Sequence, residues 1–458
     1  MQPLTCTEIL EATGGTLVSG NPMEIFTGVS TDSRKIRPGD LFVPLIGQRF
    51  DGHRYIGDTF SAGALGAVTQ EEQTLPGEKA VIRVDNTLKA LGDIAGFYRR
   101  KFTVPFTAIT GSVGKTSTKD MISCVLGRKF RVLKTEGNFN NEIGLPLTLL
   151  NLCDMHQAAV VEMGMSGFGE ISRLTAMARP RIAVITNIGL AHIEKLGSRE
   201  NILKAKLEIL EGLDKDGLVV LNGDDELLSG LKGQLGFRTV FFGTEEGSDY
   251  RAYNIRVLGE SGSYFDVTVS EKEYRVFVPS PGIHNVYNAL AAIAAGMELG
   301  VPVEEAVLGI AAFEPGKMRL NITSNGRWKV INDAYNASPQ SMEAAISVLK
   351  DMESGGRRIA VLGDMLEMGE WARDAHYGVG RFAASRGIDC IVAVGENGIH
   401  IIRGARDAGL PGECLQAFRT NEEAIRFLQE FAGQGDVLLV KGSRGMKMEE
   451  IVQSLLNG

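Results

Sequence analysis

Short apolar runs alternate with amphipathic helical stretches through the middle of this chain. The apolar runs that we interpret as strands are Phe106–Thr110, Ala158–Glu162, Ile182–Asn187, Leu218–Leu221 and Thr239–Phe242. Continuous apolar runs of this length, separated by helices, are typical of buried strands in βαβ units. The pattern therefore predicts an α/β fold built on a parallel sheet.

The same reading divides the chain into three parts. Before Lys101, short strands at Asp40–Leu45, Gly66–Thr69 and Ala80–Val84 are mixed with short helices. Residues 250–278 look like antiparallel strands with a turn at 260–263, and a helix is expected at Asn285–Leu299. Strand and helix then alternate again after Gly316, with strands at Trp328–Asn332, Ile359–Leu362, Cys390–Val394 and Val437–Val440. We expect three domains, at 1–101, 102–316 and 317–458, with the chemistry in a cleft between the second and third.

Composition narrows the class of protein. The 458 residues carry a formal net charge of −8, which argues against a surface that mainly binds nucleic acid. The five cysteines are scattered without a C-x-x-C pair, as expected of reduced thiols. The start of the chain has no basic region followed by an apolar one, and no apolar run reaches transmembrane length. The expectation is a soluble, cytoplasmic protein.

The strongest local signal is a glycine-rich turn between a strand and a helix, Thr107-Ala-Ile-Thr-Gly-Ser-Val-Gly-Lys-Thr-Ser117. It departs from the usual G-x-x-x-x-G-K-[ST] because Ile109 stands at the first glycine position. A chance Gly-Lys-Thr in a surface loop is the alternative, but the strand and helix around it favour ATP or GTP. Backbone N–H groups and the helix N-terminus would receive phosphate. The loop residues are Thr110, Gly111, Ser112, Val113, Gly114, Lys115 and Thr116.

Further polar residues follow predicted strands. Glu162 ends one strand, where ligands bind in such sheets, although an ordinary strand-end acid is the alternative. His192 lies in the loop after another strand, and a lone histidine is more often a surface or core residue than a ligand. The segment Lys204-Ala-Lys206 alone indicates a solvated helix surface. Asn285 is interpreted as a helix N-cap, while Asn288, one turn on, is harder to explain in that way.

These residues together resemble the Mur ligases, the ATP-dependent amide-forming enzymes of peptidoglycan precursor synthesis. The resemblance covers all three segments in order and rests on Thr110–Thr116, Glu162, Asn187–His192, Ala205-Lys206, Gly282–Ala292, Arg319 and Asp333. Three segments resemble the branch that joins D-alanyl-D-alanine to a UDP-N-acetylmuramoyl-tripeptide: Asp333–Met342, Val361–Gly369 and Val440–Arg444. The Asp-Asn-Pro-Arg sequence usual in the preceding ligase is absent.

The resemblance implies a small N-terminal domain for the UDP precursor, a central P-loop ATPase domain and a C-terminal Rossmann-like domain. It also implies an acyl phosphate made from ATP, with two Mg²⁺ ions. Thr116 and Glu162 would hold one ion, and His192 and a carbamylated Lys206 the other. Lys115 would steady the phosphates. The remaining ATP contacts would be Asn288, Arg319, Asp333, Tyr335 and Asn336.

The resemblance places the UDP end of the precursor near Ser33, Arg34, Asn138 and Asn140. Asp364, Lys441 and Arg444 are candidates for the dipeptide side of the cleft. We expect a monomer with no nucleic-acid partner. A related Mur-type or folylpolyglutamate-type ligase with another substrate, and a non-catalytic nucleotide-responsive binding protein, are the alternative functions.

Overall fold

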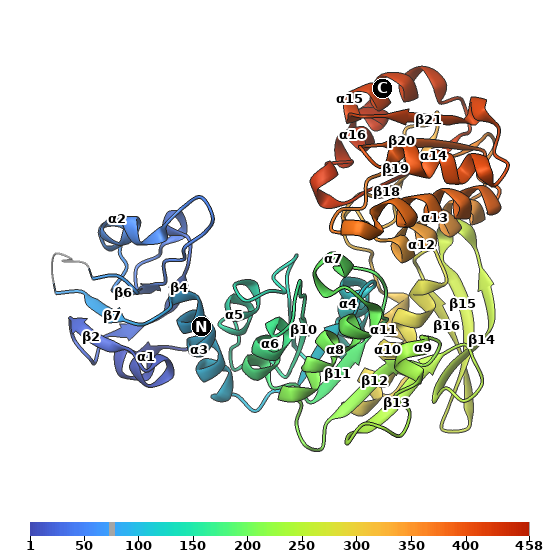
Figure 1. Cartoon of the computed structure of the whole chain (residues 1–458). Coiled ribbons are helices and arrows are strands. Elements are labelled where there is room, and N and C mark those ends of the chain that lie inside the picture. The colour runs from blue at the N-terminus through green and yellow to red at the C-terminus, as the bar shows by residue number, and fades with distance from the viewer. Residues whose placement is uncertain (73–77, 458) are drawn as a thin grey trace. The chain divides into compact units, whose positions relative to one another are not determined.

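The computed structural model describes residues 1–72 and 78–457 (Figure 1). The chain forms two compact units. One contains residues 1–108, 130–183 and 208–217, and the other contains residues 109–129, 184–207 and 218–458. No helix among the described residues is long and apolar enough to cross a membrane.

The first unit begins with a five-stranded sheet in the order β2-β7-β6-β5-β4, in which β4 to β7 are parallel and β2 is antiparallel to β7. Leu4–Thr5 (β1) and Ile25–Phe26 (β3) form a separate antiparallel pair. The strands of the larger sheet are Thr16–Ser19 (β2), Gly28–Ser30 (β4), Asp40–Phe42 (β5), Gly66–Thr69 (β6) and Ala80–Arg83 (β7). Its helices are Cys6–Thr13 (α1), Ile56–Ser61 (α2) and Thr87–Arg100 (α3), with short 3₁₀ turns at Ser33–Lys35 (η1) and Gly52–Tyr55 (η2).

Helix α3 ends the first predicted domain, and Arg99 in its last turn anchors the chain that follows. Its guanidinium donates to the carbonyls of Phe102, Val104 and Ala178 and stacks on the ring of Phe106. Burial lowers the pKa of Arg99 to about 10. These bonds fix residues 102–104 against the C-terminal end of helix Glu170–Ala178 (α6). The positive charge of Arg99 also interacts favourably with the negative end of the α6 dipole.

The central sheet has nine strands, in the order β16-β15-β14-β13-β12-β11-β8-β10-β9. The strands that come first in the chain are Phe106–Thr110 (β8), Val132–Lys134 (β9), Ala158–Glu162 (β10) and Ile182–Ile185 (β11). Helix Gly144–Leu149 (α5) lies between β9 and β10, and the 3₁₀ turn Glu208–Gly212 (η3) comes later in the chain than β11. Every residue of β8, β10 and β11 is buried, as the continuous apolar runs predicted.

In the second unit, Leu218–Asn222 (β12), Arg238–Gly243 (β13) and Tyr250–Val257 (β14) pair in parallel. Ser263–Val269 (β15) and Lys272–Val278 (β16) then extend the sheet in antiparallel fashion, as expected. The helices here are Lys115–Gly127 (α4), Ile193–Leu196 (α7), Arg199–Leu207 (α8), Glu226–Ser229 (α9), His284–Glu298 (α10) and Val303–Ala311 (α11).

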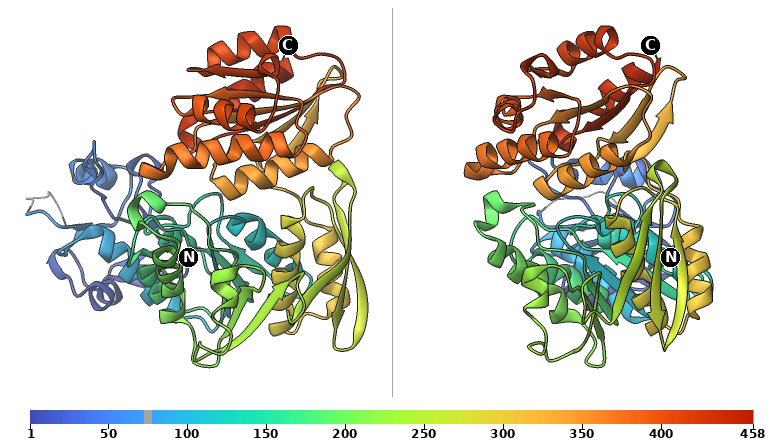
Figure 2. Two further views of the ribbon diagram at one scale, coloured as in Figure 1. Left: turned by 45° about the vertical axis from the view of Figure 1, so that its right-hand side comes forward. Right: turned by 90° about the vertical axis from the view of Figure 1, so that its right-hand side faces the viewer.

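The C-terminal part of that unit is a six-stranded sheet in the order β17-β18-β22-β19-β20-β21, parallel except for the edge strand β17. Helices α12, α13 and α14 cover one face, and α15 and α16 cover the other (Figures 1 and 2). The strands are Asn321–Ser324 (β17), Lys329–Asp333 (β18), Arg358–Gly363 (β19), Cys390–Val394 (β20), Leu415–Phe418 (β21) and Val437–Lys441 (β22). The helices are Pro339–Asp351 (α12), Ala372–Ser385 (α13), Gly398–Asp407 (α14), Asn421–Phe431 (α15) and Glu449–Asn457 (α16), and Gly369–Trp371 (η5) precedes α13.

Candidate active site

The glycine-rich loop joins β8 to α4, and two of its glycines are required by geometry. Gly111 has φ +149°, and a Cβ there would lie 1.9 Å from Thr186 Oγ1. Gly114 has φ +86°, and its Cβ would lie 3.0 Å from Asn288 Oδ1. Both positions need the conformational freedom and small volume of glycine. Ile109, which stands at the first glycine position of the usual motif, is accommodated because it still lies inside the buried strand β8.

Asn187 holds this loop in shape, a role that the sequence did not indicate. The Ser112 N–H donates to the Asn187 carbonyl at 3.0 Å. The side chain of Asn187 accepts from the Val113 N–H at 2.9 Å and donates to the Val113 carbonyl at the same distance. Thr186 Oγ1 donates to that carbonyl as well, at 2.6 Å. The only local signal is an amide at the last position of a predicted strand.

Three basic side chains gather beside the loop. Lys115 Nζ donates to the Gly111 carbonyl at 2.8 Å. Burial, followed by the charge of Lys115, lowers the pKa of Lys206 well below its ordinary value. Burial and Lys115 also lower the pKa of His192, against the opposing effect of Glu367. These shifts show that Lys115, Lys206 and His192 lie close enough to affect one another, and a group of basic side chains favours nearby phosphate or carboxylate oxygens.

The burial of Lys206 contradicts the solvated helix surface that the local sequence predicted. Its side chain is only 2% exposed on α8, whereas Lys204 on the same helix is exposed. The surface interpretation is therefore wrong for Lys206 and right for Lys204. A lysine in a polar helical stretch carries no local sign of burial, because the packing partners come from elsewhere in the chain.

Arg319 approaches the loop from the start of the C-terminal part. Its Nη2 donates to Thr116 Oγ1 at 2.9 Å, and its guanidinium carbon lies 4.3 Å from the centre of the Tyr335 ring. The flanking residues Met318 and Leu320 have φ of +57° and +51°. Such backbone is unfavourable for non-glycine residues and persists where the surroundings determine it. Arg319 is thus a planar, pre-oriented donor beside the predicted phosphate loop.

Asn285 and Asn288 form a buried chain of side-chain hydrogen bonds behind the loop. Thr118 Oγ1 donates to Asn288 Oδ1 at 2.9 Å, and Asn288 Nδ2 donates to Asn285 Oδ1 at 3.0 Å. Asn285 Nδ2 then donates to Ser280 Oγ. The N-cap prediction for Asn285 is wrong, because α10 begins one residue earlier and Asn285 lies in its first turn. Asn288 thus packs against α4 at the base of the loop.

Asp333 is engaged by neighbours in the same unit. Lys441, 2% exposed, donates to Asp333 Oδ2 at 2.6 Å and to the Asn336 carbonyl at 2.8 Å. The Leu320 N–H donates to Asp333 Oδ1 at 3.2 Å. The pair therefore ties the segment that carries Arg319 to the ends of β18 and β22.

His284 makes a pH-dependent contribution to stability near this pair. Burial lowers the pKa of His284 to about 4, although Asp333 opposes the shift. The unfolded histidine titrates near 6.5, so between about pH 6.5 and 4 the unfolded chain binds the additional proton. Stability should therefore fall as the pH drops through this window, by up to about 1.4 kcal/mol per pH unit from this group.

The measurement is the urea unfolding midpoint of wild type and His284→Gln at pH 7.5, 6 and 5. We expect the glutamine variant to lose less stability on acidification than wild type. Parallel losses in the two proteins would show that His284 does not carry the effect.

Glu162 belongs to the first unit, where hydrogen bonds from neighbouring segments fix its position. The carboxylate is buried at the end of β10 and accepts from Asn140 Nδ2 at 2.8 Å. Its backbone N–H donates to Thr135 Oγ1. Asn140, expected to face the precursor, thus orients the predicted metal ligand, while Asn138 is exposed.

Two of the predicted UDP-binding residues, Ser33 and Arg34, lie on η1. Arg34 forms a two-pronged pair with Asp32, with Nε–Oδ1 and Nη2–Oδ2 distances of 2.8 and 2.9 Å. Hydrogen bonds from Arg34 lower the pKa of Asp32 to about 2. Asp32 also accepts from the Arg34 N–H, so it caps the turn that carries Ser33.

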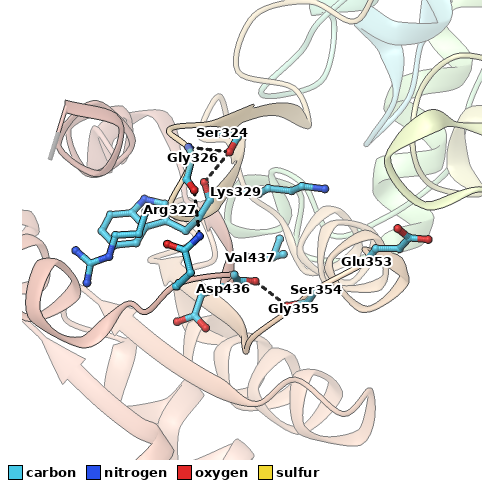
Figure 3. Close-up of a pocket in the computed structure, with 12 residues that line it drawn as sticks. Ser324, Gly326, Arg327, Lys329, Glu353, Ser354, Gly355, Asp436 and Val437 are labelled. Atoms are coloured by element: carbon cyan, nitrogen blue, oxygen red, sulfur yellow. Dashed lines mark hydrogen bonds between the residues drawn. The ribbon is translucent and has the colours of Figure 1, made fainter.

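The remaining candidates have structural partners. Buried Asp364 accepts from the N–H groups of Glu396 and Asn397, which anchors the loop before α14. Arg444 is exposed and pairs with Glu449 at 2.9 Å. A hollow of about 420 Å³ is lined by residues near the starts of β18 and β22, among them Arg327, Lys329 and Asp436, which Figure 3 labels. It contains none of the predicted site residues.

Comparison with known families matches all three parts of the chain. Residues 25–99 match the Mur ligase family catalytic domain, residues 109–296 the Mur ligase middle domain, and residues 318–444 the Mur ligase glutamate ligase domain.

Individual relatives and structures agree with this. The UDP-N-acetylmuramoyl-tripeptide–D-alanyl-D-alanine ligase of Bacillus subtilis is 42% identical, over 99% of this chain and 98% of that protein. The Escherichia coli protein of the same name is 36% identical over 93% of each chain. A crystal structure of MurF from Acinetobacter baumannii covers 100% of both chains with a TM-score of 0.92 at 33% identity. MurF from Thermotoga maritima in complex with ADP, at 27% identity, covers 94% of this chain and 97% of that one, with a TM-score of 0.83.

Proposed function

Because the chain belongs to the Mur ligase family, we propose that it is the MurF-type, ATP-dependent ligase that joins D-alanyl-D-alanine to UDP-N-acetylmuramoyl-tripeptide. The observation that carries this proposal is the near full-length match to the Bacillus subtilis ligase. The product would be the UDP-linked pentapeptide precursor of peptidoglycan. The three-domain α/β fold and the nucleotide-binding loop fit this activity.

The chemistry requires activation of a carboxylate, because an acid and an amine do not condense in water unaided. The C-terminal carboxylate of the tripeptide would attack the γ-phosphorus of ATP, releasing ADP and forming an acyl phosphate. The amine of the dipeptide would then attack the acyl carbon, and phosphate would leave as the amide forms. Such steps are accelerated mainly by positioning and charge stabilisation.

Within this mechanism Lys115 would neutralise the transferring phosphate. Arg319 would exchange its bond to Thr116 for phosphate oxygens, since a guanidinium binds such oxygens with two donors. Asn288, Asp333, Tyr335 and Asn336 stay in the proposal as residues that shape the nucleotide site.

The Thr116 hydroxyl and the Glu162 carboxylate are oxygen donors, which Mg²⁺ prefers. We propose that Thr116 and Glu162 hold one ion, and that His192 and Lys206 hold a second. Mg²⁺ would screen the negative charges that otherwise repel the attacking carboxylate. Asn140, through its hydrogen bond to Glu162 Oε1, would orient this carboxylate.

Lys206 would take part as a carbamate. Its depressed pKa favours the neutral amine, which can attack CO₂, giving an N-carboxylate and one proton. The result replaces a buried neutral amine with an anionic oxygen ligand.

The proposal also covers the binding of the UDP end of the precursor, the oligomeric state and the cellular location. Ser33, Arg34, Asn138 and Asn140 are proposed to lie along the UDP-sugar path, with domain boundaries near residues 101 and 316. We propose a monomer that works in the cytoplasm, where ATP is available and the five cysteines stay unpaired, as they are in this structure.

The test is ADP release and product mass in reactions of ATP, Mg²⁺, D-alanyl-D-alanine and UDP-muramoyl-tripeptide, with either meso-diaminopimelate or lysine as the third residue. We expect ADP formation to depend on both substrates and the product mass to grow by one dipeptide. Amide formation only with a glutamate-type substrate would indicate the folylpolyglutamate-type alternative. ATP binding without substrate-stimulated turnover would indicate the non-catalytic one.

A further inference from the structure

A carboxylate from the C-terminal part holds the imidazole of His192. Glu367 Oε2 lies 2.6 Å from His192 Nδ1. Both residues have left-handed backbone, with φ of +65° at His192 and +61° at Glu367. Two such residues in direct contact show that the surrounding chain determines the geometry of this pair.

A second side chain from the C-terminal part bonds to the loop that carries His192. Gln340 Oε1, on α12, accepts from the Leu190 N–H at 3.2 Å. From the phosphate loop, Ser112 Oγ accepts from the Gly189 N–H at 2.8 Å. A Cβ on Gly369 would lie 2.9 Å from Glu194 Cγ, so the chain after Glu367 also packs closely against α7. The segment 189–192 is therefore fixed from both sides.

A carboxylate bound to one imidazole nitrogen decides what the other nitrogen can do. When Nδ1 carries the proton toward Glu367, Nε2 presents its lone pair outward, and this arrangement recurs around metal-binding histidines. We propose that Glu367 is a positioning residue that fixes His192 for the second metal ion. This inference rests on the proposed function, because it takes His192 to be a metal ligand.

A purely stabilising role for the pair is the alternative. The Glu367 side chain is 55% exposed, and exposed pairs of this kind add little to stability. Loss of the carboxylate should therefore leave unfolding nearly unchanged and weaken metal binding, which separates the two roles.

The experiment measures Mn²⁺ binding by electron paramagnetic resonance in the full-length protein with ADP. We expect Glu367→Ala to weaken one class of Mn²⁺ site by about 10- to 100-fold. Glu367→Gln should fall between, because its amide oxygen still accepts from Nδ1. Glu370→Ala, an exposed carboxylate three residues later, is the matched control and should bind as wild type does.

His192→Ala distinguishes failure of this inference from failure of the proposed site. If His192→Ala weakens Mn²⁺ binding and Glu367→Ala does not, the positioning role is overturned and the metal site stands. If neither variant changes binding, the assignment of His192 as a ligand fails as well. A lowered unfolding midpoint in Glu367→Ala with unchanged Mn²⁺ binding would assign the pair to stability alone.

Discussion

Lys206→Met is expected to reduce amide formation by about 10³-fold or more and, at the same time, to raise the stability of the folded protein. Activity should fall because methionine can neither form a carbamate nor supply an oxygen ligand. Stability should rise because methionine needs no hydration, whereas burial lowers the pKa of the Lys206 amine.

The sign of the pH dependence follows from the same shift. In the unfolded chain the amine is protonated at neutral pH, so unfolding takes up a proton that the folded protein excludes. Wild type should therefore lose stability relative to Lys206→Met as the pH falls, in buffer depleted of CO₂. Urea unfolding midpoints at several pH values measure this difference.

Lys204→Met is the matched control, because that exposed lysine lies on the same helix. It should leave both activity and stability close to wild type. Added bicarbonate should restore activity to CO₂-depleted wild type, and a short carboxylic acid should partly restore Lys206→Ala. A fully active Lys206→Ala enzyme would reject the carbamate.

Arg319→Ala should lower kcat/KM by about 10³-fold, comparable to the loss of an arginine that stabilises phosphoryl transfer elsewhere. The guanidinium is already oriented by Thr116 and the Tyr335 ring, so it meets the transferring phosphate with little reorganisation. Arg319→Lys should recover only part of the rate, because an ammonium is a point charge that lacks the planar pair of donors. Steady-state kinetics with varied ATP measures both effects.

Arg327→Ala provides the comparison for this prediction. Arg327 also stacks on an aromatic ring, that of Trp328, and donates to the Ala432 carbonyl, but it lies beside the hollow of Figure 3. Its loss should leave kcat unchanged. Equal loss of rate in the two variants would mean that the Arg319 effect comes from damage to the domain.

The sequence predicted best what is encoded locally. The glycine-rich turn between a strand and a helix, buried runs such as Ala158–Glu162, and the helix near residues 285–299 all follow from neighbouring residues. The edge strands β17 and β21 were missed, because β17 is a four-residue, partly polar segment whose pairing depends on β18.

Contacts between segments that are distant in sequence could not be predicted from the local pattern of residues. Asn187 is separated from Val113 by 74 residues, and Glu367 from His192 by 175 residues. Nothing in the immediate neighbourhood of either residue shows which partner it meets. The family resemblance supplied the proposed role of Lys206, and it assigned no role to Asn187 or Glu367.

The hydrogen bonds that Asn187 makes to Ser112 and Val113 have a thermodynamic consequence for nucleotide capture. A side chain from outside the loop bonds to both the N–H and the carbonyl of Val113 and so holds the curved conformation of the loop. A nucleotide that binds there does not have to order the loop, so less of its interaction energy is lost to conformational entropy. In this shortened loop, part of the rigidity is supplied by Thr186 and Asn187, the two residues that follow the neighbouring strand β11.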